Sequence, residues 1–101
     1  MPSFIFMISK LVPGMTNVQL LARVISKDAP RTVNTKYGST KVCDALLKDE
    51  TGEIGLTLWS DQIGKVKEGD EVIIKGAYTS EWQGEVKLNL PKKSEILKKE
   101  E

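Results

Sequence analysis

Three aromatic residues of this chain, Trp59, Tyr78 and Trp82, are placed where a ring can stack against another flat molecule. They make up half of the six aromatic residues, and they fall at the end of one predicted strand and in the hairpin between two later strands. Stacking of a nucleobase on an aromatic ring is worth about 1–3 kcal/mol and tolerates any sequence. A duplex hides the faces of its bases. The three residues therefore predict sequence-tolerant binding of single-stranded nucleic acid.

Tryptophan is also a large hydrophobe that often fills a core, so each indole has a structural alternative. Trp59 alternates with Leu58 in a strand whose leucines face inward, which turns the indole outward. Trp82 lies between Glu81 and Gln83, in a segment with no other apolar residue. The pattern favours exposed positions for both tryptophans.

The orientation of Tyr78 is left open by the alternation of its strand. Plain alternation from Val72 and Ile74 points Tyr78 into the core. Only a break in the strand near Gly76 turns the ring outward, because a bulge shifts the side-chain parity by one. The pattern alone is compatible with both orientations.

Basic side chains provide candidate contacts to phosphate or sugar. Arg23 lies opposite the buried face of its strand, whereas Arg31 and Lys36 fall in a loop able to close over a bound strand. Because 15 basic and 14 acidic residues leave a net charge of only +1, affinity cannot rest on a strong positive field. We therefore expect a shallow salt dependence, with the rings supplying much of the affinity. The complete set of candidates is Arg23, Arg31, Lys36, Lys41, Lys75 and Lys87.

Five segments with a two-residue period predict an all-β chain. They cover residues 18–25, 39–48, 54–59, 71–77 and 85–90. Residues 28–38 are predicted as a flexible basic loop, and residues 60–70 as a short helix or turn that ends at Gly69. Five strands with a short helix between the third and fourth match the five-stranded Greek-key barrel called the OB-fold.

The OB-fold domain is predicted to cover residues 11–92, between an apolar extension at residues 1–10 and a charged tail at residues 93–101. The apolar run Phe4 to Ile8 is shorter than a secretory signal or the roughly 20 residues that span a bilayer. We expect it to add an edge strand or a self-association surface. The tail is expected to be solvated, with a helical turn through Ile96 and Leu97 as the alternative. These features predict a cytoplasmic protein that is a monomer or a weak homo-oligomer.

Catalytic and metal chemistry find no support in the composition. The chain has no histidine and a single cysteine, Cys43, so it offers neither an internal disulfide nor a zinc cluster. Cys43 has the parity of a core position, and the scattered Ser and Asp residues have no general base to pair with. The sequence predicts a non-enzymatic protein with no cofactor and no metal.

The sequence also resembles the simple archaeal single-stranded DNA-binding proteins, which are related to eukaryotic single-OB proteins and to replication protein A. The resemblance implies one OB-fold that binds single-stranded DNA, with stacking rings at Trp59, Tyr78 and Trp82, and so favours the outward orientation of Tyr78. It also implies protection of exposed strands in replication, recombination and repair, with recruited partner proteins, in the nucleoid. The stretches that carry the resemblance are Leu11–Met15, Asp49–Gly52, Leu56–Trp59, Lys67–Asp70, Gly76–Tyr78, Trp82–Gly84 and Val86–Asn89.

Two features depart from the family pattern. Many archaeal members carry a long Gly-rich or acidic tail for partner contacts, whereas this sequence stops at Glu101. Some eukaryotic relatives have a further aromatic residue where this chain has Asn89. A fourth stacking ring is therefore not expected at that position.

Two other functions fit the same residues. Stacking does not distinguish the 2′-hydroxyl, so single-stranded RNA is an alternative ligand. The barrel is alternatively an interaction module of a larger replication or repair complex, with Trp82 as a protein-binding hot spot. The sequence leaves these alternatives open.

Overall fold

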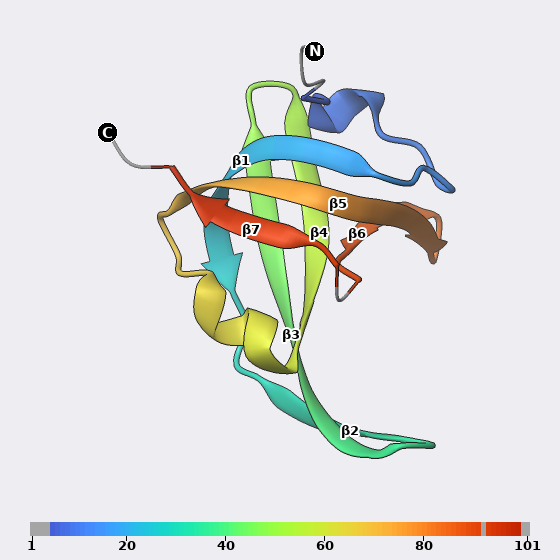
Figure 1. Cartoon of the computed structure of the whole chain (residues 1–101). Coiled ribbons are helices and arrows are strands. Elements are labelled where there is room, and N and C mark those ends of the chain that lie inside the picture. Colours follow the sequence, from blue (N-terminus) through green and yellow to red (C-terminus); the bar gives the residue numbers. More distant parts are fainter. Residues whose placement is uncertain (1–4, 92, 100–101) are drawn as a thin grey trace.

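Seven strands form one sheet in a computed structural model that describes residues 5–91 and 93–99 (Figure 1). Two short 3₁₀ helices, η1 (Ile8–Lys10) and η2 (Ser60–Lys65), complete the described elements. The five predicted strands correspond to β1, β3, β4, β5 and β6, so the all-β prediction is confirmed. The strands are β1 (Val18–Lys27), β2 (Arg31–Thr35), β3 (Gly38–Asp49), β4 (Gly52–Trp59), β5 (Glu71–Trp82), β6 (Glu85–Asn89) and β7 (Glu95–Lys98).

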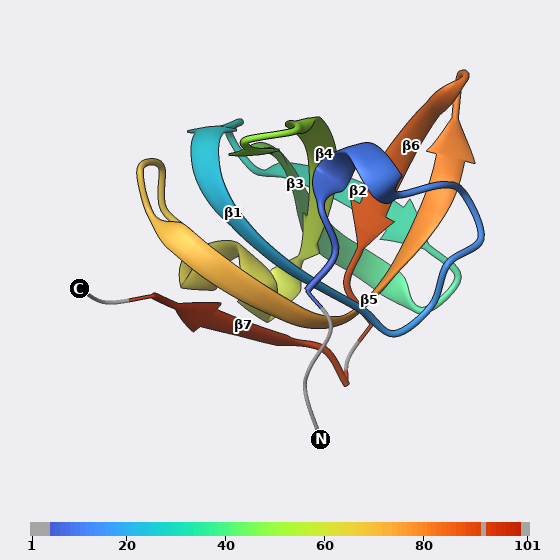
Figure 2. The same ribbon diagram turned by 90° about the horizontal axis from the view of Figure 1, so that it is seen from above.

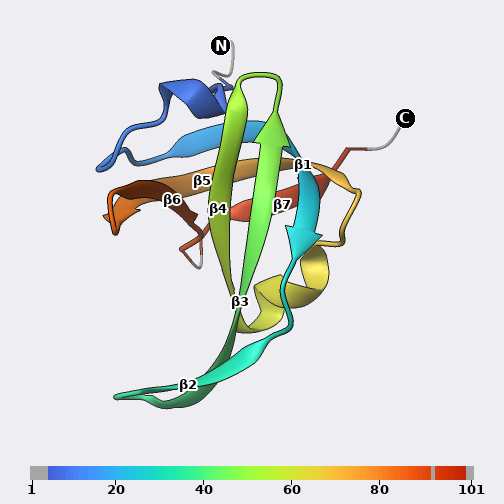
Figure 3. The same ribbon diagram turned by 180° about the vertical axis from the view of Figure 1, so that it is seen from behind.

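Five of these strands close into a barrel (Figures 1 and 3). They follow the order β1-β3-β4-β6-β5, and β1 pairs again with β5, which joins the two ends of the series. The pairs of this ring are antiparallel except β4 with β6, which is parallel. The ring is the predicted OB-fold barrel, and its closure removes the free edges that an open sheet would expose.

Alternating apolar side chains fill the barrel, as the two-residue period predicts. Because the leucines of β4 point inward, Thr57 and Trp59 of the same strand point outward. Val42 is an exception, since it is buried on the outer face of β3, where it pairs with Arg31 and Trp59. The inward residues of the first three barrel strands are Val18, Leu20, Ala22, Val24, Cys43, Ala45, Leu47, Ile54, Leu56 and Leu58.

A bulge in β5 determines the orientation of Tyr78. The register with β1 shifts between Ile74 and Ala77, so β5 gains one residue there. Gly76 lies in the bulge with φ of 79°, a conformation that glycine adopts without steric cost. Ala77 consequently points inward and Tyr78 outward, which is the break that outward exposure of Tyr78 requires.

Residues 28–38 are not the flexible loop that the sequence predicts. Arg31–Thr35 form β2, which pairs with the first part of β3 from Arg31 opposite Val42 to Thr35 opposite Gly38. The prediction was wrong because β2 is short and its residues are polar and largely exposed, so it has no apolar alternation to detect. The paired residues 31–42, called the arm below, project from the barrel (Figure 1).

The connection between β4 and β5 contains the 3₁₀ helix η2, which ends at Lys65 and not at the predicted Gly69. Val66 follows η2 and is fully buried. The Lys27 ammonium donates hydrogen bonds to the carbonyl oxygens of Ile63 and Val66, at 2.6 and 2.8 Å. These contacts hold the segment against one end of the barrel (Figure 1).

The described part of the apolar extension contacts the barrel through an isolated bridge, apolar packing and hydrogen bonds. Phe6 forms an isolated parallel bridge with Leu20, and Ile8 lies in the core. The Ile8 N–H donates to the Asp49 carboxylate at 2.8 Å, which ties the extension to the β3–β4 turn. Phe4 lies outside the described residues.

Residues 95–98 form β7, so the predicted solvated tail and the alternative helical turn were both wrong for this segment. β7 pairs with β5 from Lys75 opposite Glu95 to Val72 opposite Lys98. Ile96 packs against the core while Leu97 is 42% exposed, the alternation of an edge strand. Four residues in a Lys- and Glu-rich segment are too few to show this period in the sequence.

Candidate functional site

The outward residues of β3, β4, β6 and β5 form rows across one continuous surface. Asp44, Thr57, Asn89 and Tyr78 are successive cross-strand neighbours in one row. The next row consists of Leu46, Gly55, Lys87 and Ser80. Together the two rows make the floor of a candidate binding surface.

The two tryptophans border these rows at opposite ends. Trp59 is the next outward residue of β4 beyond Thr57, and Trp82 is the next outward residue of β5 beyond Ser80. Trp59 is 41% exposed, Tyr78 42% and Trp82 64%, although large aromatic residues are usually well buried. All three predicted rings therefore lie accessible on the same surface.

Trp82 owes its exposure to the turn that follows it. Gln83 and Gly84 both have positive φ, 51° and 81°, which is the signature of a tight two-residue hairpin. Trp82 pairs with Glu85 across this turn. The β5–β6 hairpin thus holds the indole beyond the last inward residue of its strand.

A groove of about 580 Å³ runs between the two tryptophans. Thr57 and Asn89 contribute to its floor, and Arg31 lines it from the base of the arm. Tyr78 lies in the row of Thr57 and Asn89 but does not line the groove itself. The ring of Tyr78 therefore extends the surface past the edge of the groove.

The floor carries a cation beside neutral polar groups. The Lys87 chain lies over Gly55, where a Cβ atom would stand only 2.8 Å from the ammonium nitrogen. The Lys87 ammonium is 3.6 Å from the Glu85 carboxylate. Asn89 Nδ2 donates to Ser80 Oγ at 2.8 Å. Such groups can bond base edges and phosphate, while the rings provide stacking.

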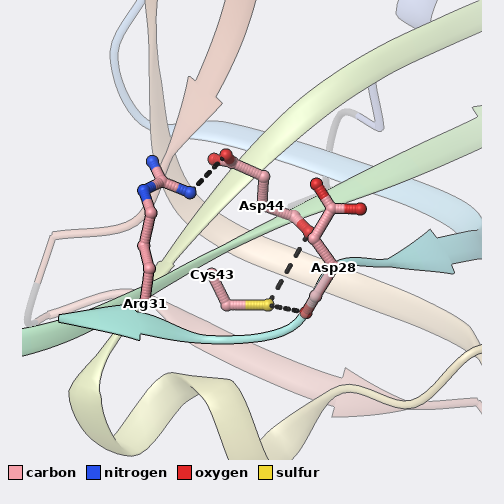
Figure 4. A network of polar contacts seen from close by, with 4 residues as sticks. All are labelled: Asp28, Arg31, Cys43 and Asp44. Carbon is pink, nitrogen blue, oxygen red and sulfur yellow. Dashed lines mark hydrogen bonds and ion pairs between the residues drawn. The ribbon is translucent and has the colours of Figure 1, made fainter.

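A small polar network closes the groove at the base of the arm (Figure 4). Arg31 Nη1 lies 2.8 Å from the Asp44 carboxylate, and both side chains are about half exposed. The Cys43 thiol, which is fully buried, donates to the Asp28 carbonyl oxygen at 2.9 Å. Burial is the main cause that raises the pKa of the Cys43 thiol above its ordinary value. Cys43 is thus a core residue, as its parity predicts.

Four of the six predicted basic contacts lie in the groove or on the arm. Arg31 and Lys87 line the groove. Lys41 lies on β3 within the arm, and Lys36 lies at the turn of the arm. Of these four, only Arg31 and Lys87 line the groove between the tryptophans, whereas Lys41 alternates with Val42 and so lies on the other face of β3.

Arg23 and Lys75 lie elsewhere. Arg23 Nη1 donates to the Gly69 carbonyl oxygen at 2.7 Å, and the side chain borders a different, largely apolar groove next to the extension. Lys75 lies on β5 before the bulge, opposite Glu95 of β7. The structure does not bring these two residues to the rings.

Sequence reasoning missed Tyr37, which lies at the turn of the arm and is 88% exposed. The Lys36 ammonium lies 5.2 Å from the centroid of its ring, a cation–π distance. The available signal was an aromatic residue in the turn Thr35–Gly38, but the surrounding segment was interpreted as a loop. Thr57 was also missed, although the alternation of its strand placed it outward, and Ser80 was missed because only the Gly76 bulge turns it outward.

Two negative findings limit the chemistry of the described part of the chain. Residues 5–91 and 93–99 contain no group of His, Cys, Asp or Glu side chains placed to hold a metal ion. No helix within the same residues is long and apolar enough to cross a membrane.

Comparison with known proteins gives a consistent result. Residues 11–98 match the family described as single-stranded DNA binding protein Ssb-like, OB fold. The chain is 37% identical over 89 residues to the single-stranded DNA binding protein Ssb of Saccharolobus solfataricus, a match that covers 88% of this chain. The matched region spans 60% of the length of that relative.

Solved structures with the same fold include proteins of DNA replication. The solution structure of the replication factor A related protein from Methanobacterium thermoautotrophicum has a TM-score of 0.80 at 28% identity, over 94% of this chain and 90% of that one. A replication protein A heterotrimer bound to ssDNA has a TM-score of 0.79 at 25% identity, over 96% of this chain and 25% of that one.

Proposed function

Since the chain belongs to the Ssb-like family of OB-fold single-stranded DNA-binding proteins, we propose that it binds single-stranded DNA in the groove between Trp59 and Trp82. Bases stack on these indoles and on Tyr78, and the chain protects exposed strands during replication, recombination and repair. The protein acts by binding and not by catalysis.

The observation that carries this proposal is the shared outward orientation of the three rings. Each ring lies on the outer face for its own backbone reason: strand parity for Trp59, the Gly76 bulge for Tyr78 and the tight turn for Trp82. Rings held outward in this way keep between 41% and 64% of their surface exposed in the free protein, so a core function does not explain them. A base face can cover each of them.

The groove also explains why single strands are preferred. Its bordering residues offer ring faces, while its cations are partly neutralised by Asp44 and Glu85. A binder that depends on phosphate charge alone would accept duplex equally well. A binder that depends on stacking requires bases whose faces are free.

Tryptophan fluorescence tests the proposal directly, because the only two tryptophans border the groove. We expect oligo(dT) to quench the emission and a duplex of the same length to leave it nearly unchanged. A matched RNA oligomer in the same titration measures any preference for the sugar. Equal quenching by single strand and duplex would contradict the proposal.

A further inference from the structure

The outer edge of β7 has no strand beside it in the part of the chain that the structure describes. β7 pairs with β5 on one side and with no other described strand. Figure 2 shows β7 at the rim of the barrel, across from β3 and β4. Because only residues of β5 before the Gly76 bulge take part in this pair, the edge lies apart from the groove. The edge presents backbone N–H and C=O groups to which a further strand can bond.

The hydrogen bonds with β5 determine which backbone groups of β7 face the outer edge. The Lys99 N–H donates to the Glu71 carbonyl oxygen at 2.8 Å. Residues of an antiparallel strand bond the same neighbour alternately, so the odd-numbered residues of β7 bond β5. The backbone groups of the even-numbered residues, Ile96 and Lys98, therefore face the outer edge.

The side chains of β7 divide between the two faces of the sheet. Ile96 packs against the core, whereas Leu97 is 42% exposed on the outer face. Glu95 and Lys99 are also exposed and lie two residues from Leu97 on either side, so they share its face. This face runs from an acidic through an apolar to a basic side chain. Such a strand is complementary to a reversed copy of itself.

An antiparallel pairing centred on Leu97 satisfies both the backbone and the side chains. It places Leu97 opposite Leu97 of a second copy, and Glu95 opposite Lys99 of that copy on both sides of the two-fold axis. Ile96 and Lys98, whose backbone groups face the edge, form the hydrogen-bonded pairs. Leu97 then lies in a pair without hydrogen bonds, where opposite side chains approach most closely.

Other centres within β7 lose this complementarity. A two-fold pairing centred on Ile96 would place Glu95 opposite Leu97, and one centred on Lys98 would place two ammonium groups opposite each other. A centre at Glu95 would bring two carboxylates together. Like charges directly opposite each other destabilise a sheet. Charge complementarity therefore favours the pairing centred on Leu97.

The strands next to β7 extend the same pattern on the outer face. Leu97 lies opposite Ile73 of β5, which lies opposite Leu21 of β1. The Lys99 ammonium is 3.5 Å from the Glu71 carboxylate of β5. In the paired sheet, an apolar row and rows of alternating charge therefore continue from one copy into the other.

We propose that the chain forms a homodimer in which two β7 strands pair antiparallel about Leu97 and join the two barrels edge to edge. Two strands of this length offer a small interface compared with the roughly 1,000 Å² of a stable one, so the dimer is weak and forms reversibly. Both grooves stay open, because β7 lies across the barrel from β3 and β4. The inference does not depend on DNA binding.

An exchange of charges tests the pairing. Glu95→Lys alone would place lysines opposite each other in the dimer, and Lys99→Glu alone would place glutamates opposite each other. A mixture of the two variants restores both pairs of opposite charge. Sedimentation from about 10 μM to about 1 mM protein measures the dimerisation constant. We expect wild type to dimerise in this range, each variant alone to dimerise at least about fivefold more weakly, and the mixture to recover the wild-type constant.

The β3–β4 hairpin provides the matched control. Lys48 and Glu53 are opposite each other across these two strands. Lys48→Glu and Glu53→Lys make the same charge changes away from β7. Each of them alone, and their mixture, should dimerise as wild type does.

Cross-linking tests the same pairing without a change of charge at Glu95 or Lys99. Leu97→Cys places two thiols opposite each other, so oxidised glutathione should produce a disulfide-linked dimer. In Glu95→Cys, the thiols of the two copies would lie four residues apart along the strands, or about 13 Å, so that variant should stay monomeric. Wild type controls for Cys43, which is buried. Circular dichroism verifies that each variant is folded.

Three results would overturn the dimer. Wild type could stay monomeric at about 1 mM, the mixture of charge variants could associate no more strongly than either variant alone, or Glu95→Cys could cross-link as readily as Leu97→Cys. A titration of Leu97→Cys with oligo(dT) separates the dimer from the proposed function, because the groove does not include β7. We expect this variant to bind oligo(dT) as wild type does.

Discussion

The two hairpins beside the groove each expose one aromatic ring, but they differ in charge. Trp82 follows Glu81 and pairs with Glu85, so acidic side chains surround the ring at the end of the β5–β6 hairpin. Tyr37 lies beside Lys36 in an arm that has no acidic residue. One hairpin offers a stacking face among carboxylates, and the other offers a stacking face beside a cation.

This difference predicts that stacking and charge neutralisation are divided between the two hairpins. The carboxylates next to Trp82 partly offset the Lys87 cation, so a nucleotide bound there is expected to gain mainly from its base. A nucleotide at the arm is expected to gain from both its base and its phosphate. Binding at the two hairpins should therefore respond differently to ring removal, backbone change and salt.

Removal of the Trp82 ring should have the largest effect. Trp82→Ala loses one stacking platform and should weaken oligo(dT) binding by about 1–3 kcal/mol, or roughly five- to 150-fold. The remaining Trp59 provides the fluorescence signal. Trp82→Phe keeps a ring and should recover most of the affinity. Because Trp82 is 64% exposed, the free energy of unfolding should be unchanged, and a loss of folding would instead support a structural function.

Disruption of the Gly76 bulge should have the second-largest effect on binding, because the bulge orients Tyr78 and has no counterpart in the arm. Gly76→Ala places a side chain at φ of 79°, which costs about 1–2 kcal/mol of folding free energy, and its Cβ would stand 3.4 Å from the Ser94 backbone. We expect a lower melting temperature together with weaker DNA binding. Gly64→Ala is the matched control, since nothing lies within 4 Å of its Cβ. Equal effects of Gly76→Ala and Gly64→Ala on melting temperature and DNA binding would contradict the function assigned to the bulge.

Asp49 lies outside both hairpins and should affect stability but not binding. Burial favours a raised pKa for Asp49, but hydrogen bonds from the Thr51 hydroxyl and from the N–H groups of Ile8, Thr51 and Gly52 outweigh it and lower the pKa. A lowered pKa in the folded state stabilises the protein above the unfolded pKa near 4, and this contribution is lost as the pH falls through the folded value.

Asp49→Asn should therefore lower the free energy of unfolding by about 1.5 kcal/mol at pH 7. The difference from wild type should shrink as the pH falls below about 4, because the protonated wild type then resembles the variant. Denaturation at several pH values measures it, with Glu50→Gln in the same turn as the control. If the difference in the free energy of unfolding between Asp49→Asn and wild type does not change with pH, the charge of the Asp49 carboxylate is not its cause.

The barrel was predictable because each of its strands buries one face. Leu56 and Leu58 alternate with Thr57 and Trp59, and that period alone fixes the strand, its buried face and the exposure of the indole. β2 and β7 were not predictable, because short strands rich in polar residues bury too little to show a period. These two strands form because they pair with β3 and β5. The partner of β7, β5, is not its neighbour in the sequence, so the pairing leaves no local signal.

The site was predictable residue by residue only where local sequence determines it. The Gly76 bulge is a tertiary feature, so the strand pattern left the orientation of Tyr78 open and only the family resemblance favoured the outward one. Alternation correctly predicted that the Arg23 side chain points out of the barrel. It does not predict on which side of the closed barrel that side chain lies, and Arg23 lies away from the rings. The rows across the floor depend on cross-strand register, which no single segment encodes.

Charge removal at the two hairpins should have the smallest effect and the clearest contrast in sign. Lys36→Gln removes one expected phosphate contact, which should lower the logarithmic salt slope by about 0.7 and weaken oligo(dT) binding by about fivefold at 0.1 M salt. Glu81→Gln removes a repulsive carboxylate beside Trp82 and should strengthen binding slightly. Titrations at several salt concentrations measure both slopes. Since both residues are exposed, neither substitution should alter folding, and opposite signs for the two variants are what a division of charge between the hairpins requires.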